Sequence, residues 1–79
     1  MYYVYILESL TNGKHYVGYT GDILERLAKH NHGKVRSTKA YKPYKLLYKE
    51  EFKDKTVARK RELFLKSGRG RDFIKSILN

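Results

Sequence analysis

The sequence predicts a small α/β domain of the α+β type, with a three-stranded, mainly antiparallel sheet flanked by helices in the order β-β-α-β-α-α. Three observations support this fold class. The chain starts with a run of β-forming residues, an Asn12-Gly13 hairpin signal follows, and two later segments combine helix caps with apolar residues at helical spacing. Since the chain has 79 residues and no cysteine, we expect one domain, residues 1–79, whose core rests on aliphatic and aromatic packing.

The first two strands are predicted at residues 2–8 and 14–20. The first segment is almost continuously apolar, which is typical of a strand covered on both faces. Asn12-Gly13 between the two segments predicts a tight antiparallel hairpin.

The loop length of this hairpin decides where Tyr5 and Tyr16 lie. A four-residue loop, residues 10–13, pairs Ser9 with Lys14 and places the two tyrosines on one side of the sheet, roughly 7 Å apart at their Cβ atoms. A two-residue loop leaves them on one side but roughly 13 Å apart. A three-residue loop separates them onto opposite faces. Only the four-residue loop creates a shared site.

A helix is predicted from Asp22 to His32. Asp22 is a good N-cap and Glu25 completes a capping box, while Gly33 is placed to end the helix. Arg26 and His30, one turn apart, are expected beside the apolar stripe and therefore at the rim of the core. The stripe expected to face the sheet comprises Ile23, Leu24, Leu27, Ala28 and Asn31.

The second half of the chain predicts a strand and two helices. A polar, basic connection at 33–43 leads to a strand at 44–52, and a helix capped by Thr56 runs to about residue 67. Gly68 to Gly70 are expected to break the chain before a short last helix at 72–78. The apolar stripe of the capped helix comprises Val57, Ala58, Phe64 and Leu65, with Glu62 at its edge.

The charge favours a polyanionic partner. The formal net charge is +10, and residues 26–49 hold eight basic residues and no acidic one. We expect nucleic acid rather than an anionic membrane, because no basic helix has a large apolar face. The alternative is a charged surface that only maintains solubility. The apolar start is too short for a membrane span or a signal peptide, so we expect a soluble, cytoplasmic protein.

Five elements of the sequence together resemble one family. Tyr3-Val4-Tyr5, Tyr16-Val17-Gly18, Arg26, His30 and Glu62 occur in the order and spacing of the GIY-YIG nuclease domain, and the chain is most similar to its small single-domain bacterial members. The sequence departs from the family pattern in three places. Tyr3 stands where the first glycine is usual, and the asparagine that follows the glutamate in larger members has no counterpart except the terminal Asn79. The segment from Lys34 to Tyr41 is also less regular than in the small members that the chain resembles.

The resemblance implies a nuclease that uses one metal ion. Glu62 would bind one Mg²⁺ (or Mn²⁺) together with the substrate, and Arg26 would bind phosphate with its planar fork. Tyr5 would take a proton from water, with its pKa lowered by nearby positive charge, and Tyr16 would position water or phosphate, although these two roles could be exchanged. His30 would donate to phosphate or orient a tyrosine. From the residues alone, Glu62 could instead pair with Arg59 or Lys66, and the tyrosines could be core residues.

The function implied by the resemblance is a metal-dependent endonuclease that hydrolyses phosphodiester bonds in DNA, in repair or recombination. The alternative is a non-catalytic nucleic-acid-binding domain that keeps the fold and the basic groove. Because no segment remains for a targeting module, we expect specificity to come from the shape of the DNA or from a protein partner. The expected nucleic-acid contacts are Gly18, Lys29, Lys34, Arg36 and Lys39.

Overall fold

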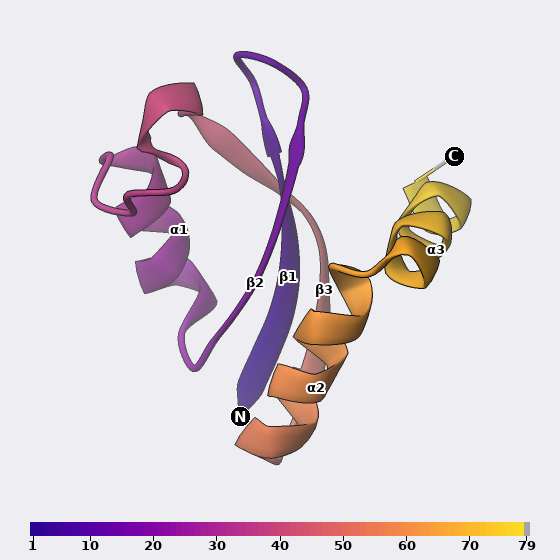
Figure 1. Ribbon diagram of the computed structural model, residues 1–79. Coiled ribbons are helices and arrows are strands. Elements are labelled where there is room, and N and C mark those ends of the chain that lie inside the picture. Colours follow the sequence, from indigo (N-terminus) through magenta and orange to yellow (C-terminus); the bar gives the residue numbers. More distant parts are fainter. Residues whose placement is uncertain (79) are drawn as a thin grey trace.

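An antiparallel sheet of three strands forms the centre of the computed structural model, which describes residues 1–78 (Figure 1). Strand β1 (Tyr2–Ser9) is the middle strand, with β2 (His15–Thr20) on one side and β3 (Tyr44–Phe52) on the other. Both neighbours run antiparallel to β1. The predicted sheet and its strand bounds are thereby confirmed to within one residue.

The helices lie on both faces of this sheet. Helix α1 (Ile23–Asn31) covers one face, and α2 (Lys55–Leu65) and α3 (Gly68–Leu78) cover the other (Figure 1). A 3₁₀ turn, Lys39–Tyr41, interrupts the connection between α1 and β3. The observed order of strands and α-helices is β-β-α-β-α-α, as the sequence predicts. None of the helices in the described part of the chain is long and apolar enough to cross a membrane.

Strand β1 is buried on both faces because its side chains alternate between two apolar clusters. Val4 and Ile6 pack against the layer formed by α2 and α3, whereas Tyr5 and Leu7 pack toward α1. This alternation explains the continuous apolar run in the sequence. It also places Tyr5 on the face that α1 covers.

The hairpin has the four-residue loop that a shared tyrosine site requires. Leu7 is paired with Tyr16, and the Ser9 amide donates to the Lys14 carbonyl over 2.9 Å. The Ser9 hydroxyl stabilises the loop, since it donates to the Tyr41 carbonyl (2.6 Å) and accepts from two loop amides, at 3.1 Å each. The predicted register is therefore confirmed, and Tyr5 and Tyr16 lie on one side of the sheet.

Helix α1 begins with half of the predicted capping box. The Asp22 carboxylate accepts from the Glu25 amide at 3.0 Å, as expected. The reciprocal bond is missing, because the Asp22 amide donates to the Thr20 hydroxyl and the Glu25 carboxylate pairs with Lys29. The helix ends before Gly33, as predicted.

The buried face of α1 differs from the predicted one. Leu24 is 81% exposed and Ala28 is also exposed, whereas His30 is completely buried. The helix turns a polar residue inward because both nitrogens of that imidazole have hydrogen-bond partners there, so its burial leaves no polar group unsatisfied. His30 is thus part of the interior, not of the rim.

The layer formed by α2 and α3 corrects three expectations. Asp54 caps α2 in place of Thr56, accepting from two backbone amides, and Glu62 lies within the buried face of that helix while Val57 and Phe64 are substantially exposed. Helix α3 begins at Gly68, so the expected break is already helical. Gly70 is buried because α3 approaches the end of α2 so closely that a side chain there would overlap the backbone of Phe64 and Leu65.

Candidate active site

Tyr5 reaches the edge of the sheet because its neighbour on β2 is a glycine. Gly18 is the pairing partner of Tyr5, and a methyl group at Gly18 would lie only 2.5 Å from the Tyr5 hydroxyl oxygen. The phenol therefore lies across the β2 backbone at a point where no side chain stands. The site needs Gly18 for close approach, which gives this predicted residue a structural function.

Three aromatic rings meet beside this glycine. The ring centroids of Tyr5 and Tyr16 are 6.4 Å apart, and His30 lies 5.9 Å from the first and 5.0 Å from the second. Tyr44 closes the cluster from β3, 6.0 Å from the imidazole. Three strands and one helix thus bring together residues that are up to 39 positions apart in the sequence.

A chain of hydrogen bonds starts at the Tyr5 hydroxyl. This hydroxyl lies 3.0 Å from His30 Nε2, and His30 Nδ1 lies 2.7 Å from the Thr38 hydroxyl. The Thr38 hydroxyl in turn donates to the Val35 carbonyl over 3.4 Å. With the single Thr38 proton directed to Val35, the neutral imidazole donates from Nδ1, and Nε2 is unprotonated and accepts from Tyr5. The arrangement therefore aims the proton of Tyr5 at a basic nitrogen.

Thr38 is a residue that sequence analysis missed. It lies in the connection after α1, and its side chain is almost completely buried. This connection folds back onto α1, since Val35 is buried and the Asn31 amide group binds both backbone polar groups of Tyr44. A lone threonine in a basic, irregular segment carries no signal for such a contact, so only the tertiary structure reveals it.

The burial of the site determines which groups are charged. Burial lowers the pKa of His30 to about 4, and the Arg26 charge acts in the same direction, so the imidazole is neutral at pH 7. Burial also raises the pKa of Tyr5 and outweighs the opposing effect of Arg26. Arg26 thus acts in the expected direction, but the pKa of the phenol lies above its ordinary value because burial is the larger cause. Tyr5 is a protonated donor to a neutral imidazole.

Arg26 lies beside the two phenols. Its pKa is raised, first by its interaction with the Tyr5 hydroxyl, and Tyr16 contributes as well. The Nε of Arg26 is buried and has no hydrogen-bond partner within residues 1–78. A buried N–H without a partner is uncommon in folded proteins, and phosphate oxygens would satisfy it.

Glu62 reaches the same region from α2. Glu62 is 4% exposed, and its charge helps to raise the pKa of Tyr5, although burial of the phenol is the larger cause. Arg59 forms an ion pair with one carboxylate oxygen, and Lys66 lies 3.1 Å from the other. The two partners foreseen for a surface glutamate are thus both present, but the carboxylate that they neutralise is buried.

This carboxylate can bind a hard divalent cation only if the substrate supplies further ligands. Within residues 1–78, no three His, Cys, Asp or Glu side chains converge to form a metal cage. Mg²⁺ is commonly bound by one or two carboxylates plus substrate phosphates and water. Arg59 and Lys66 are about half exposed, so they can turn to solvent or to phosphate and leave Glu62 to the cation. The residues therefore suit a metal that arrives with the nucleic acid.

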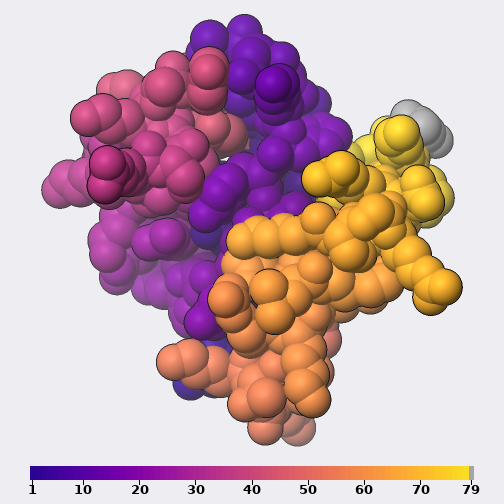
Figure 2. Space-filling model, viewed as in Figure 1, coloured from indigo at the N-terminus to yellow at the C-terminus, as the bar shows by residue number. Residues whose placement is uncertain are grey.

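The lysines and the arginine that are predicted to contact nucleic acid lie at the periphery of the candidate active site. Lys29 pairs with Glu25 along the surface of α1, with 3.0 Å between the charged atoms. Lys34, Arg36 and Lys39 are exposed in the connection after α1. In the space-filling view this magenta segment borders the central purple strand on the side opposite α2 and α3 (Figure 2).

Comparison with known proteins agrees with this arrangement. The family model of the GIY-YIG catalytic domain matches residues 1–73. A UPF0213 protein of Streptococcus pneumoniae is 45% identical over 65 residues, which cover 81% of this chain and 65% of that protein. A UPF0213 protein of Staphylococcus saprophyticus is 40% identical over 67 residues, covering 84% of this chain and 80% of that protein. This chain thus spans somewhat less than two thirds of the streptococcal relative.

A solved structure shares the fold as well. The solution NMR structure of a UPF0213 protein from Bacillus halodurans is similar over 98% of this chain and 85% of that one, with a TM-score of 0.58 and 36% sequence identity. The match of the family model covers nearly the whole chain. The two tyrosines and the histidine of the motif form one ring cluster, the arginine lies beside it, and the charge of the glutamate acts on Tyr5. The chain belongs to the GIY-YIG family of nuclease domains.

Proposed function

We propose that the protein is a metal-dependent endonuclease that hydrolyses phosphodiester bonds in DNA, in repair or recombination. The observation that carries the proposal is the hydrogen bond from the Tyr5 hydroxyl to the neutral Nε2 of His30. A phenol is a poor base because its ordinary pKa is about 10, but a phenol that can pass its own proton to an imidazole is able to accept another.

The proposed reaction uses this hydrogen bond as a relay. Water attacks the phosphorus while the bond from phosphorus to the leaving oxygen of the strand breaks. The proton of the water moves to the Tyr5 oxygen, the proton of Tyr5 moves to His30 Nε2, and the leaving oxygen takes a proton from solvent. The imidazolium that results keeps its Nδ1–H bonded to Thr38, so the ring stays oriented throughout the transfer. A bound phosphate supplies negative charge that raises the low pKa of His30 and so favours the transfer.

Charge stabilisation comes from the other residues. Arg26 binds a non-bridging phosphate oxygen through its guanidinium group, whose Nε has no partner in the described structure. Tyr16, whose ring is next to that of Tyr5, positions the phosphate or the attacking water. Glu62 would hold one Mg²⁺ or Mn²⁺, which would neutralise the charge that develops on the phosphate.

A single experiment can test the reaction and the roles of these residues. Labelled duplex, branched and single-stranded DNA and matching RNA are incubated with wild-type protein, with and without Mg²⁺ or Mn²⁺. Glu62→Gln and Tyr5→Phe should each lower the metal-dependent cleavage rate, by about a hundredfold or more, while Glu51→Gln on the exposed part of β3 should not. Undiminished cleavage by Glu62→Gln would refute the metal role.

One observation favours a second candidate, a non-catalytic nucleic-acid-binding domain. Arg59 and Lys66 already neutralise the Glu62 carboxylate, which is the arrangement that a structural glutamate would have. Salt-sensitive binding of every substrate without metal-dependent cleavage of any would establish this alternative.

A further inference from the structure

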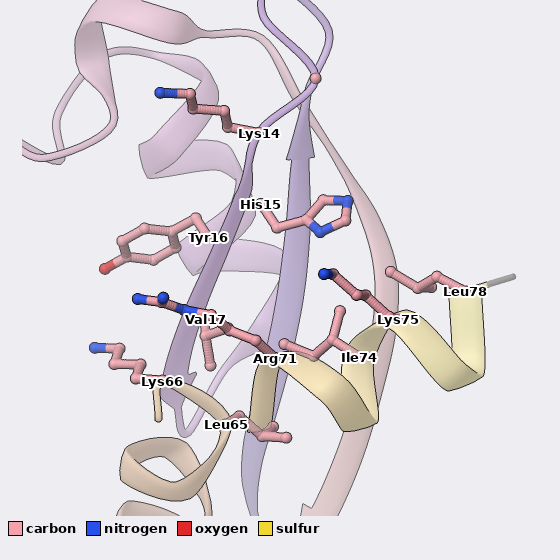
Figure 3. A pocket seen from close by; sticks show the side chains of 11 residues that line it. Lys14, His15, Tyr16, Val17, Leu65, Lys66, Arg71, Ile74, Lys75 and Leu78 are labelled. Carbon is pink, nitrogen blue, oxygen red and sulfur yellow. The ribbon is translucent and has the colours of Figure 1, made fainter. Parts of the chain in front are cut away.

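A second basic surface lies outside the motif residues. A groove of about 910 Å³ runs between the β2 side of the hairpin and α3, and it reaches Tyr16 at the candidate active site. In Figure 3 the side chains of Lys14, Tyr16, Lys66 and Arg71 extend toward the same side of the molecule, although they come from the hairpin and from the region where α2 passes into α3. The groove and the active site therefore share a border.

The charge of the groove has one sign. Four cationic side chains line it, from Lys14, Lys66, Arg71 and Lys75, and within residues 1–78 no acidic side chain does. Lys66 pairs with Glu62, whereas the other three form no ion pair within those residues. Three unpaired cations around one groove attract an anion that has several charges.

We propose that this groove binds the sugar-phosphate backbone of one nucleic-acid strand, namely the strand whose scissile phosphate lies at Tyr16. The inference rests on the proposed function, since it extends the path of the same substrate. Arg71 and Lys75 are one helical turn apart on α3, so their charges follow each other along the groove and contact successive phosphates. The apolar floor, which includes Val17 and Ile74, packs against sugars.

Lys66 connects this groove with the candidate metal ligand. Its ammonium group lines the groove and at the same time lies 3.1 Å from a Glu62 carboxylate oxygen. A backbone phosphate that forms an ion pair with Lys66 therefore deprives Glu62 of one of its ion-pair partners. An acidic peptide would also be attracted by the cations, but only a nucleic acid continues into a site that binds phosphate, which is why the nucleic acid is favoured.

The test compares two double variants that each remove two positive charges. Arg71→Ala/Lys75→Ala changes the groove, while Lys53→Ala/Lys60→Ala changes exposed residues that do not line it. Binding of a fluorescent single-stranded oligonucleotide is measured by anisotropy without divalent cations, from 0.05 to 1 M salt. Losing two phosphate contacts should reduce the salt slope of the affinity by about 1.4, which corresponds to about 25-fold weaker binding at 0.1 M salt if affinities are equal at 1 M. The control should keep the wild-type slope.

The outcomes separate this inference from the proposed function. If the groove variant keeps the wild-type slope, or loses no more than the control, the groove proposal is overturned even where the wild type cleaves DNA. If its slope falls as expected while the wild type cleaves nothing, the groove stands and the endonuclease proposal fails. Polyglutamate of equal charge is the second probe. Equal affinity for it, with the same loss in the groove variant, would identify a site for acidic peptides and overturn the proposal.

Discussion

The buried imidazole of His30 predicts a loss of stability in mild acid. Its pKa lies at about 4 in the folded protein, against an ordinary value of 6.5. Between these values the unfolded chain binds a proton that the folded protein does not bind, so the free energy of unfolding must fall as the pH falls. The contribution of this residue is fully present above pH 6.5 and has been lost once the pH falls below about 4.

The size of the effect follows from the two pKa values. Between pH 7.5 and pH 5 the difference in proton binding at His30 amounts to about 2 kcal/mol of unfolding free energy. That is a large fraction of the roughly 4–12 kcal/mol that a domain of this size has in total. Carboxylates contribute little above pH 5, because their ordinary pKa values lie lower.

Urea unfolding at several pH values between 7.5 and 5 measures this loss. Wild type should lose about 2 kcal/mol over the range, and His30→Gln should lose little of it, because that side chain does not titrate. His15→Gln and His32→Gln are the matched controls, since both residues are exposed, and they should behave like wild type. An equal loss in His30→Gln, or an NMR titration of His30 near pH 6.5, would refute the argument.

Two further predictions concern the residues that hold the relay in place. Thr38→Val leaves the Nδ1–H of His30 buried without an acceptor and should cost about 1–3 kcal/mol in urea unfolding, whereas Thr38→Ser keeps the hydroxyl and should cost less. Equal losses would show that packing rather than the hydrogen bond matters. Gly18→Ala places a methyl group 2.5 Å from the Tyr5 hydroxyl oxygen and should lower both the melting temperature and the cleavage rate, because the phenol must move away from His30. Gly68→Ala, where a methyl group meets no atom within 4 Å, is its control, and a similar effect of both changes would contradict the close-approach argument.

The site combines two demands that oppose each other. Burial orients Tyr5 and His30 and excludes water, but it also keeps both groups neutral and therefore unreactive. Substrate resolves this conflict in the proposed reaction, because phosphate brings the negative charge that favours a protonated imidazole. The hydrogen bonds among Tyr5, His30 and Thr38 align the proton path of the proposed reaction.

Local sequence patterns determined the fold class, the strands, the presence of a hairpin and the first helix of this protein, but left three loop lengths open for the hairpin. The Asn12-Gly13 signal and the length of the loop set the register that brings Tyr5 and Tyr16 to one side of the sheet, and these are contacts between neighbours in the chain. The motif spacing also pointed to the five residues that the structure brings together. Only the tertiary structure decided which faces of the helices are buried, as His30 and Glu62 show.

The reason is that burial of a polar side chain depends on partners far away in the sequence. His30 faces inward because Tyr5 and Thr38 satisfy its two nitrogens. The spacing of apolar residues along the helix cannot predict these hydrogen-bond partners, because they lie on other segments of the chain. The same holds for the pKa of Tyr5, where burial outweighs the nearby arginine. Residue types and spacing therefore determined what chemistry this protein could carry, while three-dimensional packing decided which of those groups are neutral, which are paired and which remain open to a substrate.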